Sequence, residues 1–392
     1  MLKKVIYHLL VVVAVFFTLN FLGKKLDKLN PIIKAISEIR FSDIYFSFSD
    51  NIKPSSEIYI IDIGDKDPIK SRAEIANFIE KINKEYKPRA IGVDVYFDSK
   101  YKDESINQRL ISSLSMDNVI RMFKVKEDFN VLYPDFSVLS SLEINTFSND
   151  GYTFGLGDAT KHPCIRYYKP TFEIDGKTYN HFSKLIAQKY LDQSSEELSL
   201  DKNIEHKMMI NYNIDFTDNR IDINDSTRYH ELKDKIVLIG LNTYKNDGTP
   251  FFNDDLHFTP KNSNYIGRSA KDSYGIEILG TIISNLINDD HLSYSETFVK
   301  WLNWIFSISV YIFLLFVFTV FNEYFVFLKI FFQTIGVLSL AVISVIVIST
   351  SNYYIDLTMA IGVMFVSAEI VEIVEELLEK LPNYIKKKLN NE

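Results

Sequence analysis

The sequence predicts an α/β fold, with a mainly parallel sheet and flanking helices, joined to a helical region that spans a membrane four times. Two observations lead to this prediction. In the middle of the chain, short β-branched runs alternate with stretches of helical periodicity, which is the pattern of a parallel sheet covered by helices. Long uncharged runs lie at the two ends, and they account for an apolar fraction of 47% beside an ordinary charged fraction of 24%.

The middle of the chain is expected to alternate between strands and helices. Short buried apolar runs bounded by turn residues indicate strands, and apolar residues repeated every three or four positions indicate helices. The expected strands are 57–62, 89–97, 119–125, 164–168, 171–174 and 235–240. The expected helices are 69–86, 104–114, 181–191 and 274–287. The first three strands and the helices between them should form one parallel sheet through right-handed crossovers.

Four apolar runs are expected to cross the membrane. They are residues 5–22, 304–321, 330–355 and 357–368. The last run is interrupted by Glu369 and Glu372 and is then followed by a basic cluster at residues 386–388. Because positive charge accumulates on the cytoplasmic side, this cluster places the C-terminus in the cytoplasm. An even number of spans places the N-terminus there too and leaves the middle of the chain outside.

These spans divide the chain into four parts. Residues 1–23 form an N-terminal transmembrane anchor, 24–300 an extracytoplasmic domain, 301–374 three transmembrane helices, and 375–392 a short amphipathic cytoplasmic tail. The expected location is the cytoplasmic (inner) membrane, with the main domain on its periplasmic side. The lipid bilayer is therefore an expected partner.

Composition and motifs exclude several classes of protein. The net charge of −8 argues against a nucleic-acid surface, because phosphate binding needs a basic face. The single cysteine, Cys164, allows neither an intrachain disulfide nor a cysteine zinc site. The phosphate-loop, H-E-x-x-H and G-x-S-x-G patterns are absent from the sequence. We therefore expect no cofactor, no metal and no enzymatic activity.

Acidic residues accompany the first two expected strands. Asp62 ends the first strand, Asp65 lies just beyond it, and Asp94 lies in the second strand, which should be its parallel neighbour. Open parallel sheets bind ligands outside the carboxyl ends of their strands. Carboxylates there could hold Ca²⁺ or Mg²⁺, or a cationic ligand. The alternative, which we favour, is structural: strand-end aspartates commonly accept hydrogen bonds from the backbone of the following turn.

Several motifs follow one another in order along the middle of the chain. They are Asp43 after the first apolar run, the acid-ended strand 60–65, the strand 90–97 with Gly92, the stretch 151–166 with Asp158 and Arg166, the strand ending at Gly240, and then Asp255, Thr259, Pro260, Gly275 and Glu277. In these motifs the chain resembles the CHASE2 family, extracellular sensory domains found mainly in bacterial membrane receptors. Leu279 departs from the family pattern, which usually has a histidine there.

The resemblance implies roles for these residues. As a hypothesis, ligand binding is assigned to Asp62, Asp65, Asp94, Asp158, Asp255 and Glu277. A structural role is assigned to Asp43, Gly92, Gly240, Thr259, Pro260 and Gly275.

The resemblance also implies a sensor. The external domain would sense a small molecule or a protein, and the spans and tail would relay the signal to a separate cytoplasmic kinase or cyclase. Family members often continue into such an output domain, and this chain is expected to lack one. Receptors of this layout are often homodimers. Two alternatives stay open: a structural component of a cell-envelope assembly that binds no ligand, and a metal-dependent hydrolase built on the same acids.

Overall fold

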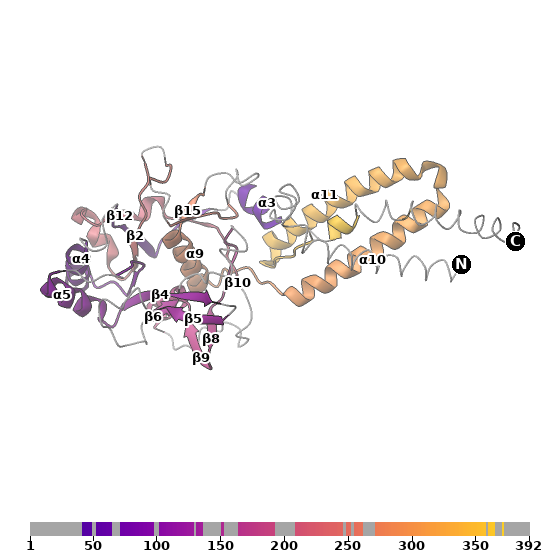
Figure 1. Ribbon diagram of the computed structural model, residues 1–392. Helices are drawn as coiled ribbons and strands as arrows, with labels where there is room; N and C mark the ends of the chain where they lie inside the picture. Colours follow the sequence, from indigo (N-terminus) through magenta and orange to yellow (C-terminus); the bar gives the residue numbers. More distant parts are fainter. Residues whose placement is uncertain are drawn as a thin grey trace, which may run out of the picture. The chain divides into compact units, whose positions relative to one another are not determined.

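The computed structural model describes residues 41–48, 52–64, 71–97, 102–128, 131–135, 150–152, 164–192, 208–245, 248–251, 255–261, 271–357, 360–364 and 371. The chain separates into two compact units, which are described one at a time. We call Asp43–Tyr294 the sheet unit, and Met1–Ser42 together with Ser295–Glu392 the hairpin unit (Figure 1). The predicted anchor 1–23 and the predicted tail 375–392 lie outside the described residues.

The sheet unit is built on one sheet with the strand order β12, β2, β13, β3, β4 and β5, in which β6 also pairs with β4. These strands are β12 (Arg220–Asp222), β2 (Ile58–Asp62), β13 (Ile236–Gly240), β3 (Ala90–Val93), β4 (Val119–Asp128), β5 (Val131–Asp135) and β6 (Asp150–Tyr152). Every pairing is parallel except that of β4 with β5. The predicted α/β fold with a mainly parallel sheet is therefore confirmed.

The strand β13 lies in the middle of this sheet, between β2 and β3. All of its residues are buried, and a strand without a polar position needs a neighbour at each edge and cover on each face. The prediction that the strands of Asp62 and Asp94 are direct neighbours is therefore wrong. Asp94 also follows β3 instead of lying within it. The reason is burial: β13 takes a central place although it comes latest in the sequence.

Among the described residues of the sheet unit, four helices flank the sheet, and they confirm four expected helices with small shifts at their ends. They are α4 (Arg72–Glu85), α5 (Glu104–Leu114), α8 (Phe182–Leu191) and α9 (Gly275–Asn288). α4 packs with α5, and these two helices carry the crossovers from β2 to β3 and from β3 to β4. α8 packs with α9; α8 lies against β3, and α9 lies against β13 and β2. Because both faces of the central strands are buried, the two helix pairs cover opposite faces.

Gly92 in β3 allows α8 to lie close to the sheet. A Cβ atom at this position would come within 2.5 Å of Ile186 Cδ1, 2.8 Å of Phe182 Cζ and 2.9 Å of Leu238 Cδ2. These three side chains come from α8 and β13 and are fully buried. The structural role expected of Gly92 therefore has a physical reason, since any side chain here would displace a packed core.

The hairpin unit contains two long apolar helices, α10 (Glu296–Val320) and α11 (Phe325–Ser351), joined by a short turn. Thr297–Val320 and Phe325–Ser351 each contain an 18-residue stretch of high mean hydropathy, 2.0 and 2.4 respectively, and both segments are long enough to cross a membrane. They correspond to the second and third predicted spans. The first predicted span lies outside the described residues, as does half of the fourth, so the count of four stays a prediction.

Asn303 of α10 connects the helices of the hairpin unit to the chain that follows α11. Its amide nitrogen donates to the carbonyl oxygen of Asp356 over 2.6 Å, and its amide oxygen accepts the backbone N–H of Ala360 at 2.9 Å. Residues 360–364 are helical. A polar side chain buried among apolar helices is stable only with partners such as these.

Candidate functional site

The candidate site lies at the carboxyl ends of the central strands. In the pairing register, Asp222 of β12 lies beside Asp62 of β2, which lies beside Gly240 of β13. Asp94 follows β3 and donates its backbone N–H to the carbonyl oxygen of Ile239 over 2.9 Å. We call this row of strand ends the carboxyl edge. The acids predicted to meet at one edge of the sheet do share it, with Gly240 standing between two of them.

Gly240 brings α9 close to the carboxyl edge. A Cβ atom here would lie 2.7 Å from Ile276 Cδ1 and 3.3 Å from the Asp94 carbonyl oxygen. Since the second contact is with backbone, it has little freedom to move away. A glycine is therefore required where the central strand passes between α9 and the end of β3.

Asp62 joins the turn after β2 to the turn after β13. Its carboxylate accepts the Gly64 backbone N–H at 2.9 Å and the Asn242 backbone N–H at 3.0 Å, and it accepts the Thr243 hydroxyl at 2.7 Å. Both carboxylate oxygens are therefore used by the protein's own donors. This arrangement agrees with the structural interpretation of Asp62, in which the aspartate holds a strand-end turn.

Glu277, in the first turn of α9, is a buried carboxylate with partners on two other segments. It accepts Arg220 Nη2 at 2.6 Å and the Tyr244 hydroxyl at 2.6 Å. It also accepts the Tyr274 backbone N–H at 3.2 Å, which caps the helix. The Arg220 guanidinium lies over the Tyr244 ring, 4.0 Å from its centroid. We call Arg220, Tyr244 and Glu277 the α9 clamp.

The Tyr244 hydroxyl is held in its protonated form within the α9 clamp. Burial raises the pKa of Tyr244 above its usual range, and the neighbouring Glu277 charge raises it further. The hydroxyl is therefore a permanent donor to Glu277. The clamp combines one positive charge, one negative charge and one neutral donor, so its charges balance.

The carboxyl edge and the α9 clamp belong to one hydrogen-bonded network. Thr243 donates to Asp62 through its hydroxyl and accepts the Tyr274 hydroxyl on its carbonyl oxygen at 2.7 Å. The Tyr274 ring packs edge-to-face against Tyr244, with centroids 5.2 Å apart. A displacement at the strand ends would therefore reach the first turn of α9 through directly contacting groups.

Asp255 occupies the N-terminal end of α9. Its carbonyl oxygen accepts the Gly275 backbone N–H at 3.0 Å, and a Cβ atom on Gly275 would lie 2.7 Å from the Asp255 carboxylate. A negative charge at a helix N-terminus is favourable because of the helix dipole. Gly275 is therefore required for close approach, and Asp255 is placed as a helix-end partner.

Sequence reasoning missed Arg220, Asn242, Thr243 and Tyr244. The last three lie two to four residues after the strand 235–240, and that position was the available signal. Asn242 is only 2% exposed, and neither polar atom of its side chain has a hydrogen-bond partner in the structure. A buried polar group left without a partner costs roughly 1–3 kcal/mol. Among the described residues near this edge, Asn242 has two side-chain polar atoms without a hydrogen-bond partner, and Arg220 has one, its Nε.

The remaining predicted residues make their contacts elsewhere. Asp43, in α3 (Phe41–Phe48), accepts Arg166 Nε at 2.8 Å and Nη2 at 2.6 Å, and both side chains are buried. Thr259 donates its backbone N–H to Asp272 at 2.8 Å and its hydroxyl to the same carboxylate, and Pro260 beside it is buried. Asp65 and Asp158 lie outside the described residues.

Asp272→Asn is expected to change how stability depends on pH. Burial raises the pKa of Asp272, and the hydrogen bonds from Thr259 oppose part of that rise. A carboxyl whose folded pKa exceeds its unfolded pKa of about 3.9 holds its proton more tightly when folded. Its contribution to stability is therefore largest below that value and falls as pH rises to the folded pKa. In the variant this decrease in stability with rising pH should be absent, as measured by Tm against pH. A slope equal to that of the unmodified protein would contradict a raised pKa at Asp272.

The hydrolase hypothesis needs a place for a metal ion. Among the residues that the structure describes, no group of three His, Cys, Asp or Glu side chains is placed to hold a metal ion. Asp62 and Glu277 both direct their oxygens at donors from the protein itself. Asp62 connects the turns after β2 and β13, and Glu277 connects α9 to Arg220 and Tyr244.

Comparison with protein families assigns the chain to a class. The family model of the CHASE2 domain matches residues 9–320, which is most of the chain. CHASE2 is a sensory domain family of signalling receptors. The chain belongs to the CHASE2 family, as the order of its motifs predicts. No curated protein and no solved structure matches it.

Proposed function

We propose that this chain is a membrane-anchored sensor that detects a ligand or partner outside the cytoplasm and relays the event to a separate cytoplasmic kinase or cyclase. One observation carries the proposal. The first turn of α9 holds the α9 clamp, and the same helix leads through residues 289–295 into α10, the first of the two helices able to cross a membrane. The site and the candidate span are therefore consecutive along the chain.

The relay would begin at the carboxyl edge. Asn242 offers an unpaired donor and an unpaired acceptor, and its backbone already bonds to Asp62. A ligand that satisfied the Asn242 amide would favour the arrangement of the strand-end turns in which that amide is accessible. A ligand can shift an equilibrium only by its difference in affinity for two states. In this proposal those states differ in the position of the first turn of α9.

The same contacts support a role in recognition without chemistry. The carboxylates of Asp62 and Glu277 are each bonded to several donors from the protein, so proton transfer by either would require the network to break. We therefore propose that the protein is not an enzyme. A homodimer of such chains would be the signalling unit.

Glu277→Gln is expected to change signal output in a chimera that carries a nucleotide cyclase domain after residue 374. The substitution removes the charge that Arg220 pairs with and so loosens the α9 clamp. We expect basal cyclase activity to change about fivefold, as for a coupling free energy of about 1 kcal/mol.

The matched control for that experiment is Glu80→Gln. Glu80 pairs with Arg109 on the solvent side of α4 and α5, away from α9. Its output should equal that of the unmodified chimera. If the Glu277→Gln chimera gave the same output as the unmodified chimera, at equal expression and Tm, the proposed relay through α9 would be contradicted. That result would favour a structural component of the envelope that binds no ligand.

A further inference from the structure

A short internal segment of the sheet unit contacts both of the places where the chain enters and leaves this unit. The chain enters at Asp43, in α3, and leaves through the C-terminal end of α9 and residues 289–294. We call residues 208–213 the junction segment. It begins with the strand β10 (Met208–Met209), and its four middle residues are buried.

Asn285, in the last turn of α9, is hydrogen-bonded to the backbone of Asn211 in both directions. The Asn211 backbone N–H donates to Asn285 Oδ1 over 2.8 Å, and Asn285 Nδ2 donates to the Asn211 carbonyl oxygen over 3.0 Å. Asn285 and Asn211 are only 1% and 6% exposed. Two neighbouring strand residues exchange the same pair of bonds, so a side chain of α9 here takes the place of a strand partner.

Asp290 extends this contact beyond the end of α9. Its carboxylate accepts Asn211 Nδ2 at 3.1 Å and Asn213 Nδ2 at 2.6 Å. Two residues further on, the Leu292 backbone N–H donates to the Met209 carbonyl oxygen over 3.2 Å. The junction segment therefore holds both the end of α9 and the stretch that leads out of the sheet unit.

The junction segment also reaches α3, by two routes. The rings of Phe46 and Tyr212 meet edge-to-face with centroids 5.9 Å apart. The Ile210 backbone N–H donates to the Arg166 carbonyl oxygen over 2.9 Å, and the Arg166 guanidinium is paired with Asp43. All five side chains are buried. Because a packed interior has little free volume, a shift of the junction segment would displace α3 as well.

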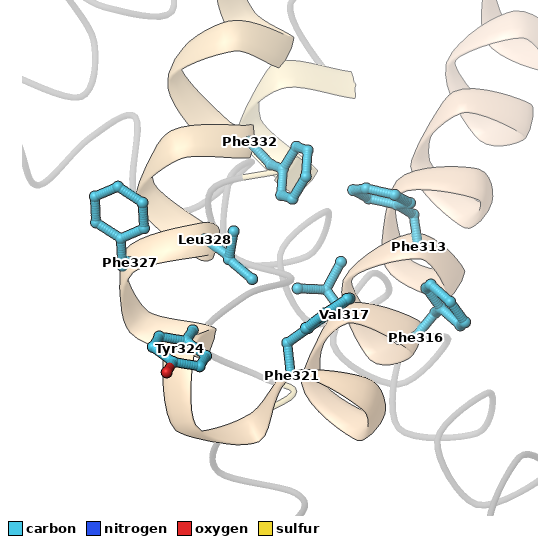
Figure 2. Close-up of a pocket in the computed structure, with 8 residues that line it drawn as sticks. All are labelled: Phe313, Phe316, Val317, Phe321, Tyr324, Phe327, Leu328 and Phe332. Atoms are coloured by element: carbon cyan, nitrogen blue, oxygen red, sulfur yellow. The ribbon is translucent and has the colours of Figure 1, made fainter.

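The stretch after residue 294 continues into α10, and α10 packs with α11. The rings of Phe313 and Phe332 meet edge-to-face between the two helices, with centroids 4.8 Å apart, beside an apolar groove (Figure 2). A displacement of α10 would therefore be shared with α11. The end of the sheet unit that the junction segment holds is thus connected, along the chain, to both helices of the hairpin unit.

We propose that the junction segment couples the two ends of the sheet unit, so that the stretches leading to the first and second predicted spans move together. The inference rests on the proposed function and adds a regulatory element to it. A continuous series of contacts runs from Asp43 through Arg166 and the junction segment to Asn285. In a relay through α10 alone, the stretch before Asp43 would be passive. With the junction segment, a shift of α9 reaches both stretches, and Asn285 is a positioning residue for that shift.

The test is hydrogen exchange of the full chain in detergent, measured on peptides by mass spectrometry. Asn285→Ala takes one acceptor and one donor from the backbone of Asn211. We expect exchange to rise together in the junction segment, in α3 and in residues 289–294 by about tenfold, because losing a buried hydrogen bond favours local opening by about that factor. Exchange of β13 should stay the same, which distinguishes this opening from general unfolding.

Asn288→Ala is the matched control. Asn288 is an exposed asparagine of the same helix, and its amide donates within that helix, to the Ser284 carbonyl oxygen over 3.0 Å. Its exchange should equal that of the unmodified chain.

Asp290→Ala is a milder second variant, because Asp290 is only half-buried, and it decides the question if Asn285→Ala fails to fold. It should raise exchange at the same three places by a smaller factor. A rise confined to the junction segment and the end of α9, with α3 unchanged, would overturn the coupling.

The cyclase chimera separates this inference from the proposed function. Glu277→Gln is expected to change output about fivefold in the unmodified chimera, and less than about twofold in a chimera that also carries Asn285→Ala. A fivefold change in both would overturn the coupling and leave the relay through α9 intact. No change in either would contradict the relay itself, and the exchange measurement would then decide the coupling.

Discussion

Asp43→Ala is expected to lower the free energy of unfolding by about 3–5 kcal/mol. Asp43 and Arg166 form a buried ion pair with two parallel hydrogen bonds, and their side chains are 7% and 5% exposed. Removing Asp43 takes two charge-assisted hydrogen bonds from a buried guanidinium, and this accounts for the size of the loss. The measurement is urea unfolding of the detergent-solubilised chain, followed by near-ultraviolet circular dichroism.

Two further variants separate a buried pair from an exposed one. Glu80→Ala breaks the pair with Arg109, whose side chains are 32% and 51% exposed, and should cost about 1 kcal/mol or less. The double variant Asp43→Ala with Arg166→Met removes both buried charges and should be less destabilised than Asp43→Ala alone. If the double variant were the less stable of the two, the loss could not be attributed to the Arg166 charge that has lost the Asp43 carboxylate.

Gly92→Val is expected to destabilise the sheet unit by about 3 kcal/mol. Its Cβ atom alone would lie within 3 Å of three buried side chains, and its two methyl groups would add further overlap. Gly92→Ala should destabilise less than Gly92→Val. Adding Ile186→Val to Gly92→Ala should restore part of the lost stability, because it removes the closest atom, Ile186 Cδ1. The same unfolding measurement reports all three variants.

Gly362→Ala provides the matched control for the glycine substitutions. A Cβ atom at Gly362 would have no heavy atom within 4 Å, so the change should be neutral or should stabilise by up to about 1 kcal/mol. A loss at Gly92 no larger than the change at Gly362 would show that α8 can move away from the sheet, against the close packing described above.

The helices were predictable from sequence because their signal is local. The periodicity over 104–114 gives the bounds of α5, and the aspartate before it caps the helix through the Ser105 backbone N–H at 2.9 Å. Strand order was not predictable in the same way. Whether β2 adjoins β3 or β13 depends on which strand is buried deepest, and that is a property of the whole sheet.

The candidate site was predictable in its place but not in its partners. The rule for open parallel sheets locates Asp62 and Asp94 at one edge, and both lie there. No local pattern connects Glu277 with Arg220 and Tyr244, because these residues meet only after β12, β13 and α9 have packed together. Likewise, Asp43 and Arg166 both stood out as motif residues, but their pairing across the chain did not.

The position of β13 has a consequence for how the protein is made. Ile58 of β2 pairs with Ile236 of β13, and Ile91 of β3 pairs with Val237 of the same strand. Neither pair can form before β13 has been synthesised. Sheets closed by such distant pairings fold slowly, and their strand edges stay open meanwhile. If the sheet unit is exported as proposed, the segment from β2 to β12 crosses the membrane before β13, its central strand. During that interval the open edges of β2 and β3 are the places where a chaperone outside the cytoplasm would bind.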